Sequence, residues 1–173
     1  AQASVMAANG QLDAVATQDW DALLYGAPVV IRNFASDGSK RMGRVIRAQR
    51  IELTQILKDN ELSRSQLIDL AIMIGTDFHP GIKGVGPKTG LKLIKEFDNI
   101  EAICEAKEKE VPERLDEIRE IFMNHPVVTI DDSDLVQGDV DVEGLKKFLV
   151  EDRQFSQKRF DNAMDLLEQA GLV

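Results

Sequence analysis

A glycine-rich hairpin between two apolar helical segments constrains the fold of this chain more than any other feature. Apolar residues recur at helical spacing over 65–74 and again over 88–97, and the residues between read GTDFHPGIKGVGP. Pro87 stands where the second helix begins, which is a position that proline prefers. Gly84 and Gly86 allow the backbone to approach a partner closely. The sequence therefore predicts a helix–hairpin–helix motif over residues 65–97.

The charge around this hairpin is opposite to that of the chain as a whole. The 173 residues carry a net charge of -9, but residues 79–97 hold four lysines and one acidic residue. Free N–H groups at a helix start, with Lys83, Lys88 and Lys92 nearby, form a cradle for phosphate. Such contacts hold a protein on a DNA backbone without reading bases. A turn with solvated lysines is the alternative, and the Gly-x-Gly-Pro-Lys pattern disfavours it.

Composition excludes several classes of protein. An apolar fraction of 43% is too high for a disordered chain, and no stretch is long and apolar enough to span a membrane. The single cysteine, Cys104, excludes a zinc site built from cysteines. A second basic segment, residues 32–50, holds six Arg or Lys and one acidic residue. The acidic run over 131–143 is interpreted as a solvated face.

The order of apolar segments predicts two regions. A helix over 1–9 and strands over 12–17 and 28–34, with a loop and short helix between the strands, indicate an α/β unit with a parallel sheet. We therefore assign residues 1–50 to an α/β core and residues 51–173 to a helical region. Helices are expected over 51–62, 65–74, 88–97, 100–106, 114–123, 143–150 and 157–170, the last capped by Ser156.

Two carboxylates follow the first predicted strand. Asp19 and Asp21 flank Trp20, and the carboxyl end of a parallel strand is where open α/β sheets bind ligands. Carboxylates held this close repel each other unless a cation lies beside them, and hard oxygen ligands suit Mg²⁺ or Mn²⁺. The alternative is an exposed turn in which one aspartate caps the next helix, and the spacing alone favours this alternative over a metal site.

Three further side chains near these motifs have alternative roles. Asp77 opens the hairpin and is a candidate third ligand, although it could instead cap the preceding helix or bond the hairpin backbone. We interpret His79 as a surface residue, because a lone loop histidine is seldom a ligand. Trp20 and Tyr25 are interpreted as packing residues.

Three separated motifs together resemble the flap endonucleases, and the archaeal members most closely. The segments are TQDWDALLYG at 17–26, the hairpin region at 70–90 and FLVEDRQFSQKR at 148–159. The resemblance implies a PIN-like 5′ nuclease fold followed by a helix–hairpin–helix of the H3TH type. It also implies a hydrolase that cuts 5′-flap DNA with two Mg²⁺ ions, Mn²⁺ being an alternative, in replication and repair.

The resemblance assigns roles residue by residue. Asp19, Asp21 and Asp77 match the catalytic metal ligands of the family. The backbone carbonyls of the hairpin match a K⁺ site, and the neighbouring residues match contacts to duplex DNA. The K⁺ ligands would be Gly81, Ile82 and Val85, and the DNA contacts would be Lys83, Gly84, Gly86, Lys88, Thr89 and Lys92.

Parts of the family pattern are missing from this chain. Its remaining acidic ligands, including a Glu pair expected immediately before Ala1, and its N-terminal half lie upstream, and its sliding-clamp peptide would follow Val173. We therefore expect the isolated chain to be inactive until an N-terminal half is supplied. Alternatives are a non-catalytic helix–hairpin–helix that docks on duplex DNA and the 5′–3′ exonuclease domain of bacterial polymerases. If the source is archaeal, the expected location is cytoplasmic and nucleoid-associated, without a membrane partner.

Overall fold

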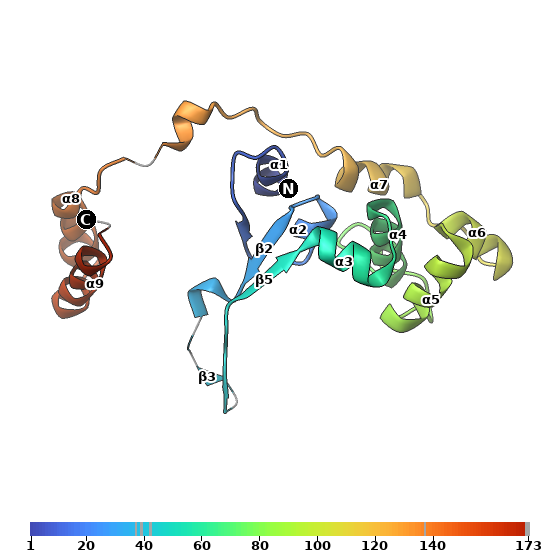
Figure 1. Ribbon diagram of the computed structural model, residues 1–173, viewed down its shortest axis with the longest axis horizontal. Coiled ribbons are helices and arrows are strands. Elements are labelled where there is room, and N and C mark those ends of the chain that lie inside the picture. Colours follow the sequence, from blue (N-terminus) through green and yellow to red (C-terminus); the bar gives the residue numbers. More distant parts are fainter. Residues whose placement is uncertain (37, 39, 42, 137, 172–173) are drawn as a thin grey trace. The chain divides into compact units, whose positions relative to one another are not determined.

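The computed structural model describes residues 1–173 except 37, 39, 42, 137, 172 and 173, and the chain forms two compact units (Figure 1). The first unit comprises Ala1–Thr129 and the second Ile130–Val173. The predicted division at residue 50 separates a sheet from helices rather than one compact unit from another, so it remains a prediction. Among the described residues, none of the helices has the length and apolar character needed to cross a membrane.

A small sheet forms the N-terminal part of the first unit. The elements here are α1 (Gln2–Ala8), β1 (Val15–Ala16), α2 (Asp21–Leu24), β2 (Val29–Arg32) and β5 (Gln49–Glu52). The strands lie in the order β1-β2-β5, with β1 at one edge. β1 runs parallel to β2, as predicted, with Val15 opposite Val30. Val30 is fully buried and anchors the cluster that α2 covers.

The other strands differ from the prediction. β5 runs antiparallel to β2 and includes Ile51, so the helix predicted from residue 51 begins later, as α3 (Leu53–Asn60). A polar edge strand with one inward apolar residue resembles the start of an amphipathic helix, which explains the error. A hairpin of β3 (Lys40–Arg41) and β4 (Arg44–Val45) was not predicted either.

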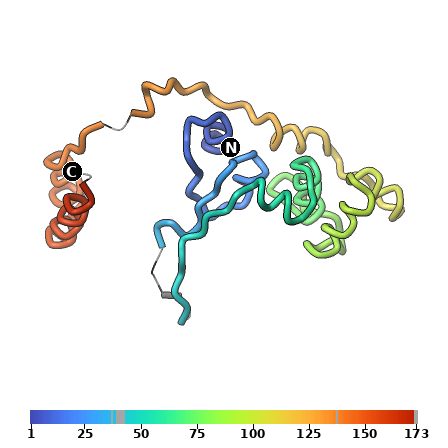
Figure 2. The backbone as a smooth tube through the Cα atoms, in the orientation of Figure 1, coloured from blue at the N-terminus to red at the C-terminus, as the bar shows by residue number. Residues whose placement is uncertain are grey.

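Helices make up the rest of the first unit, and Figure 2 traces them in order after the sheet. They are α4 (Arg64–Ile74), α5 (Pro87–Phe97), α6 (Ile100–Ala106) and α7 (Leu115–Met123). Ser63 caps α4 in a reciprocal capping box: its Oγ accepts the Gln66 N–H at 3.1 Å, while Gln66 Oε1 accepts the Ser63 N–H at 2.8 Å. At Gly90 an added Cβ would lie 2.7 Å from Leu70 Cδ1, so α4 and α5 pack closely at this glycine and a larger residue would displace the Leu70 side chain.

The second unit contains η2 (Asp132–Leu135), α8 (Val142–Lys146), a π-helical turn η3 (Lys147–Asp152) and α9 (Gln157–Gln169). Phe160 and Met164 of α9 are its buried apolar side chains. The helix predicted over 143–150 is thus α8 continued by the π-turn. Ser156 holds the predicted N-cap position, but its side chain makes no capping hydrogen bond to the described residues of α9.

Candidate functional site

The two predicted carboxylates Asp19 and Asp21 lie where the chain leaves β1. The Thr17 N–H donates to the Ile31 carbonyl at 3.1 Å, which extends the parallel ladder one residue past β1. The chain then turns: the Asp19 N–H donates to Thr17 Oγ1 and the Asp21 N–H to Asp19 Oδ1, each at 3.0 Å. Asp19 therefore braces the start of α2, as the alternative interpretation expected, while both carboxylates stand at the carboxyl edge of the sheet.

Asp77 comes from a different part of the chain, and its charge acts on Asp21. The pKa of Asp21 is raised, chiefly by burial and then by the negative charges of Asp19 and Asp77. The positively charged amino group of Ala1 opposes this rise in pKa. Burial raises the pKa of Tyr25, and the negative charges of Asp21, Asp19 and Asp77 raise it further.

The three carboxylates of Asp19, Asp21 and Asp77 suit a metal ion by their chemistry but do not surround one in this structure. Ionised oxygen ligands of this kind suit Mg²⁺ and Mn²⁺. Within the described ranges, however, no three His, Cys, Asp or Glu side chains converge closely enough to hold an ion. The catalytic and metal-binding roles of Asp19, Asp21 and Asp77 therefore remain predictions, and the group needs further ligands or a shift of its loops to close around a cation.

Tyr25 packs as predicted, whereas Trp20 does not. The Tyr25 ring lies 5.1 Å from the ring of Phe122 and 5.3 Å from that of His125, measured between centroids. Trp20 is 50% exposed, and the guanidinium of Arg32 lies 4.1 Å from its ring centroid. A tryptophan beside a strand end usually fills a core, and here it instead forms a half-exposed stack with an arginine.

The hairpin between α4 and α5 is a tight turn held at its base. The Ile82 N–H donates to the Met73 carbonyl at 2.8 Å, and the Val85 N–H donates to the Ile82 carbonyl at 2.9 Å. Gly84 has a φ of +85°, which suits the third position of a type II turn. At Gly81, where φ is +88°, an added Cβ would lie 2.5 Å from the Ile74 carbonyl oxygen. Only glycine fits there without displacing the end of α4.

His79 belongs to the hairpin rather than to the exposed surface. Its ring is partly buried, and Nδ1 accepts the Gly81 N–H at 3.1 Å. The backbone of Thr76 also pairs with that of His79 across the loop. The interpretation of His79 as a surface residue is therefore wrong, because a loop histidine two residues before a strained glycine can support that glycine's backbone.

The predicted DNA contacts surround the start of α5. Gly86 is the N-cap residue and Pro87 follows it, as predicted. Exposed side chains here belong to Lys83, Lys88, Thr89 and Lys92. A cavity of about 410 Å³ beside them is lined by Gly84, Val85, Thr89, Lys92, Leu93, Glu96, Lys107 and Lys109. Their roles as DNA contacts remain predictions.

Two of the cavity's lysines were not predicted from the sequence. Lys107 and Lys109 follow α6 and alternate with glutamates, so their segment shows no excess of positive charge. The fold nevertheless brings Lys109 to the hairpin, where its Nζ donates to the Lys83 carbonyl at 2.8 Å. A hairpin carbonyl thus already binds one cation, an ammonium group. Binding of K⁺ by the carbonyls of Gly81, Ile82 and Val85 stays a prediction, and the Ile82 carbonyl also accepts the turn's own hydrogen bond.

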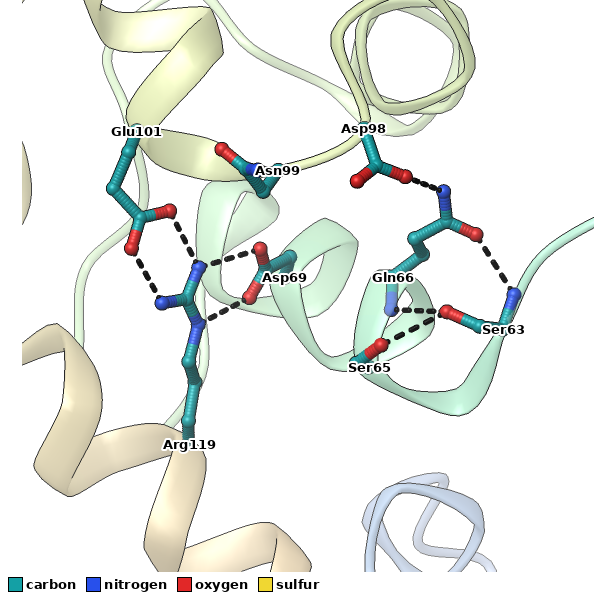
Figure 3. Close-up of a pocket in the computed structure, with 8 residues that line it drawn as sticks. All are labelled: Ser63, Ser65, Gln66, Asp69, Asp98, Asn99, Glu101 and Arg119. Atoms are coloured by element: carbon teal, nitrogen blue, oxygen red, sulfur yellow. Dashed lines mark hydrogen bonds and ion pairs between the residues drawn. The ribbon is translucent and has the colours of Figure 1, made fainter.

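A partly buried ion-pair network joins α4, which precedes the hairpin, to two later helices (Figure 3). Asp69 of α4 accepts from Arg119 of α7, with Nε–Oδ1 and Nη2–Oδ2 distances of 2.7 Å. The Arg119 guanidinium also contacts both carboxylate oxygens of Glu101 on α6, at 2.6 and 2.7 Å. Asp69 further accepts the Ile100 N–H at 3.2 Å. This network, which we call the Asp69–Arg119 clamp, joins three helices and was not predicted.

Comparison with known proteins places the chain. The XPG I-region family matches residues 1–77. The flap endonuclease 1 of Methanosarcina acetivorans is 42% identical over 175 residues, which covers 98% of this chain and 51% of that protein. The flap endonuclease 1 of Pyrococcus furiosus is 40% identical over 176 residues, covering 98% of this chain and 50% of that protein. This chain thus spans about half the length of the curated relatives it matches.

Solved structures agree with this placement. Flap endonuclease-1 from Methanococcus jannaschii superposes with a TM-score of 0.76 at 38% identity, covering 95% of this chain and 48% of that chain. The catalytic core of Rad2 in complex with DNA substrate gives a TM-score of 0.76 at 20% identity, over 99% of this chain and 60% of that chain, which supports the fold. The predicted resemblance and fold class are confirmed. Along its length this chain is similar to flap endonucleases, and it matches the C-terminal half of these relatives.

Proposed function

We propose that this chain supplies the C-terminal half of a structure-specific 5′-flap endonuclease and 5′–3′ exonuclease that hydrolyses DNA phosphodiesters in replication and repair. The observation that carries the proposal is the 42% identity to a flap endonuclease over 98% of this chain, a match that includes Asp19 and Asp21 after β1 and Asp77 after α4. Two Mg²⁺ ions, or Mn²⁺, bound there would activate a water and stabilise the leaving oxygen.

The chain's own residues would hold the metals and the duplex. Asp19 and Asp21 present their carboxylates from a turn that is braced by hydrogen bonds from their own N–H groups, and Asp77 would add a third from the segment after α4. The Lys83, Lys88 and Lys92 side chains and the N–H groups at the start of α5 would contact DNA phosphates. This division of labour fixes the duplex at the hairpin while the carboxylates meet the scissile phosphate.

Two features support a partner segment that completes the site. The family's Glu pair is expected immediately before Ala1, so a preceding segment would bring these two carboxylates. β1 is an edge strand of the sheet, so its free edge can pair with another strand. An N-terminal half of the same protein would supply both. A sliding-clamp peptide after Val173 and a cytoplasmic, nucleoid-associated location complete the proposal.

The test is cleavage of a labelled 5′-flap duplex in Mg²⁺ and K⁺, with this chain alone and with the N-terminal half added in trans. We expect no cutting by the chain alone and cutting after reconstitution. The matched control is one variant in which Asp19, Asp21 and Asp77 are all changed to Asn. This variant should lose cutting but retain duplex binding.

A non-catalytic duplex-docking module is the second candidate, and it is favoured by the absence of a convergent metal group among the described residues. Duplex binding without cutting in either tube would establish it. Binding in both cases should fall steeply with salt, because phosphate contacts release counterions. The proposed DNA-docking face is the hairpin with Lys83, Lys88 and Lys92. If changing these three lysines to Ala in one variant does not lower duplex affinity, this assignment is contradicted.

A further inference from the structure

Arg32 makes an unusual set of contacts beside the candidate carboxylates. It is the last residue of β2, and its guanidinium lies 4.1 Å from the centroid of the Trp20 ring. Its Nη2 donates to Gln18 Oε1 at 3.3 Å. Its Nε is buried and has no hydrogen-bond partner among the described residues. Burying a donor without a partner lowers stability, so folding alone does not favour this placement.

The topology explains why Arg32 reaches this segment. β1 and β2 are parallel neighbours, so their carboxyl ends meet at the same edge of the sheet. Arg32 ends β2, and residues 18–21 follow β1 directly. Within these residues the contacts alternate: Gln18 and Trp20 touch Arg32, while Asp19 and Asp21 carry the candidate carboxylates. One guanidinium therefore holds every second residue of the segment that presents the carboxylates.

The support acts on a short stretch between two elements. The parallel ladder ends at Thr17 and α2 begins at Asp21, and between them the Asp19 and Asp21 N–H groups donate to Thr17 Oγ1 and Asp19 Oδ1. The negative charges of Asp19 and Asp77 act on Asp21, so a contact that fixes this stretch opposes their repulsion. The planar guanidinium matches both of its partners, since it stacks on an aromatic face and donates to an amide oxygen at the same time.

We propose that Arg32 is a positioning residue for the Asp19–Asp21 segment, holding Trp20 and Gln18 so that the two carboxylates keep the spacing a divalent cation needs. This inference rests on the proposed nuclease function. We call the contacts of Arg32 with Gln18 and Trp20 the latch, and its effect can be measured without DNA cleavage.

Trp20 provides that measurement, because it is the one tryptophan of the chain. Its fluorescence reports its own stacking and, through quenching by Mn²⁺, the occupancy of the neighbouring carboxylates. The variants are Arg32→Met, which removes the charge and the plane, and Arg32→Lys, which keeps the charge alone. Arg50→Met is the matched control, since Arg50 is exposed on the neighbouring strand β5 and pairs with Glu52 at 3.0 Å.

We expect Arg32→Met to make Trp20 more accessible to acrylamide and to raise the Mn²⁺ concentration for half-saturation about tenfold, the typical effect of losing a support behind metal ligands. Arg32→Lys should recover less than half of this loss, and Arg50→Met should match wild type. The inference is overturned if Mn²⁺ does not quench the wild type saturably, or if Arg32→Met retains wild-type quenching and half-saturation. It also fails if Arg32→Lys restores both, because charge rather than the planar stack would then suffice.

Thermal melts and flap cleavage separate this inference from its alternatives. If Arg32→Met no longer melts cooperatively, the test relies on Arg32→Lys instead. If that variant folds and its Mn²⁺ concentration for half-saturation equals that of wild type, the latch is overturned. In the reconstituted assay, a latch effect should appear as a lower kcat that excess Mn²⁺ partly restores, with KM for DNA unchanged. A wild type that does not cut, together with shifted Mn²⁺ binding in Arg32→Met, would contradict the nuclease and keep the latch. If wild type and Arg32→Met both cut the flap with the same dependence on metal concentration, that result would support the nuclease function and contradict the latch.

Discussion

Removing one charge from the Asp69–Arg119 clamp should destabilise the first unit strongly. The Asp69 side chain is 5% exposed, and it accepts three hydrogen bonds, two from Arg119 and one from the Ile100 N–H. In Asp69→Asn an NH₂ group replaces one carboxylate oxygen and faces a donor of the guanidinium. The substitution therefore loses an ion pair and sets two donors against each other in a buried site.

The magnitude follows from the burial of the two partners. Breaking a buried pair from one side costs about 3–5 kcal/mol. Arg119 is 25% exposed and keeps Glu101, so the lower end applies, and we expect the free energy of unfolding to fall by about 3 kcal/mol. For a chain of this size that lowers Tm by about 6–12 °C.

Urea unfolding followed by Trp20 fluorescence is the assay, because Trp20 lies in the same compact unit as the clamp. Glu117→Gln is the matched control: it breaks the exposed pair with Arg114 and should leave the urea midpoint essentially unchanged, because solvent screens that pair. If Asp69→Asn costs less than about 1 kcal/mol, the clamp does not fix the helices as inferred.

Further predictions concern the hairpin and the pH dependence of the fold. Gly81→Ala should weaken both the fold and duplex binding, because its Cβ would meet a carbonyl oxygen of α4 at 2.5 Å, whereas Gly86→Ala meets nothing within 4 Å and should fold normally in a thermal melt. Lys109→Met should lower duplex affinity and reduce the slope of log affinity against log salt by about one, and an unchanged slope would exclude a phosphate contact. The hydrogen bond from Arg119 holds the pKa of Glu101 below its ordinary value of 4.5. Stabilisation from Glu101 is therefore present above pH 4.5 and lost as the pH falls through the lower folded-state pKa, so Glu101→Gln should reduce the acid-induced drop in Tm, and equal drops would contradict this.

Local sequence signals predicted the elements that local chemistry determines. Pro87 at the start of α5 and the helical spacing of α4 follow from short local patterns, and the parallel pairing of β1 with β2 follows from the order of neighbouring segments, with Val15 opposite Val30. The placement of Asp19 and Asp21 at the sheet edge followed from the same topology. Such features depend on propensity and periodicity, which a single sequence displays.

Contacts between distant residues were not predictable in this way. Lys109 reaches the Lys83 carbonyl across 26 positions, and Arg119 reaches Asp69 across 50. Both lie in segments where lysine or arginine alternates with acidic residues, a pattern that is typical of solvated helix faces. The exposure of Trp20 depends on Arg32, which stands 12 residues later on another strand. Tertiary packing decides such cases, and the sequence pattern carries no separate signal for them.

The account is tested most directly by single-turnover cleavage of a 5′-flap duplex by the reconstituted halves, comparing wild type with Asp77→Asn. Asp77 is exposed and lies far along the chain from Asp19 and Asp21, so its loss should leave the fold and duplex affinity intact. Losing one metal ligand should slow cleavage by about 100-fold or more. Cleavage by Asp77→Asn at the wild-type rate would contradict the assignment of these three carboxylates to one metal-dependent site.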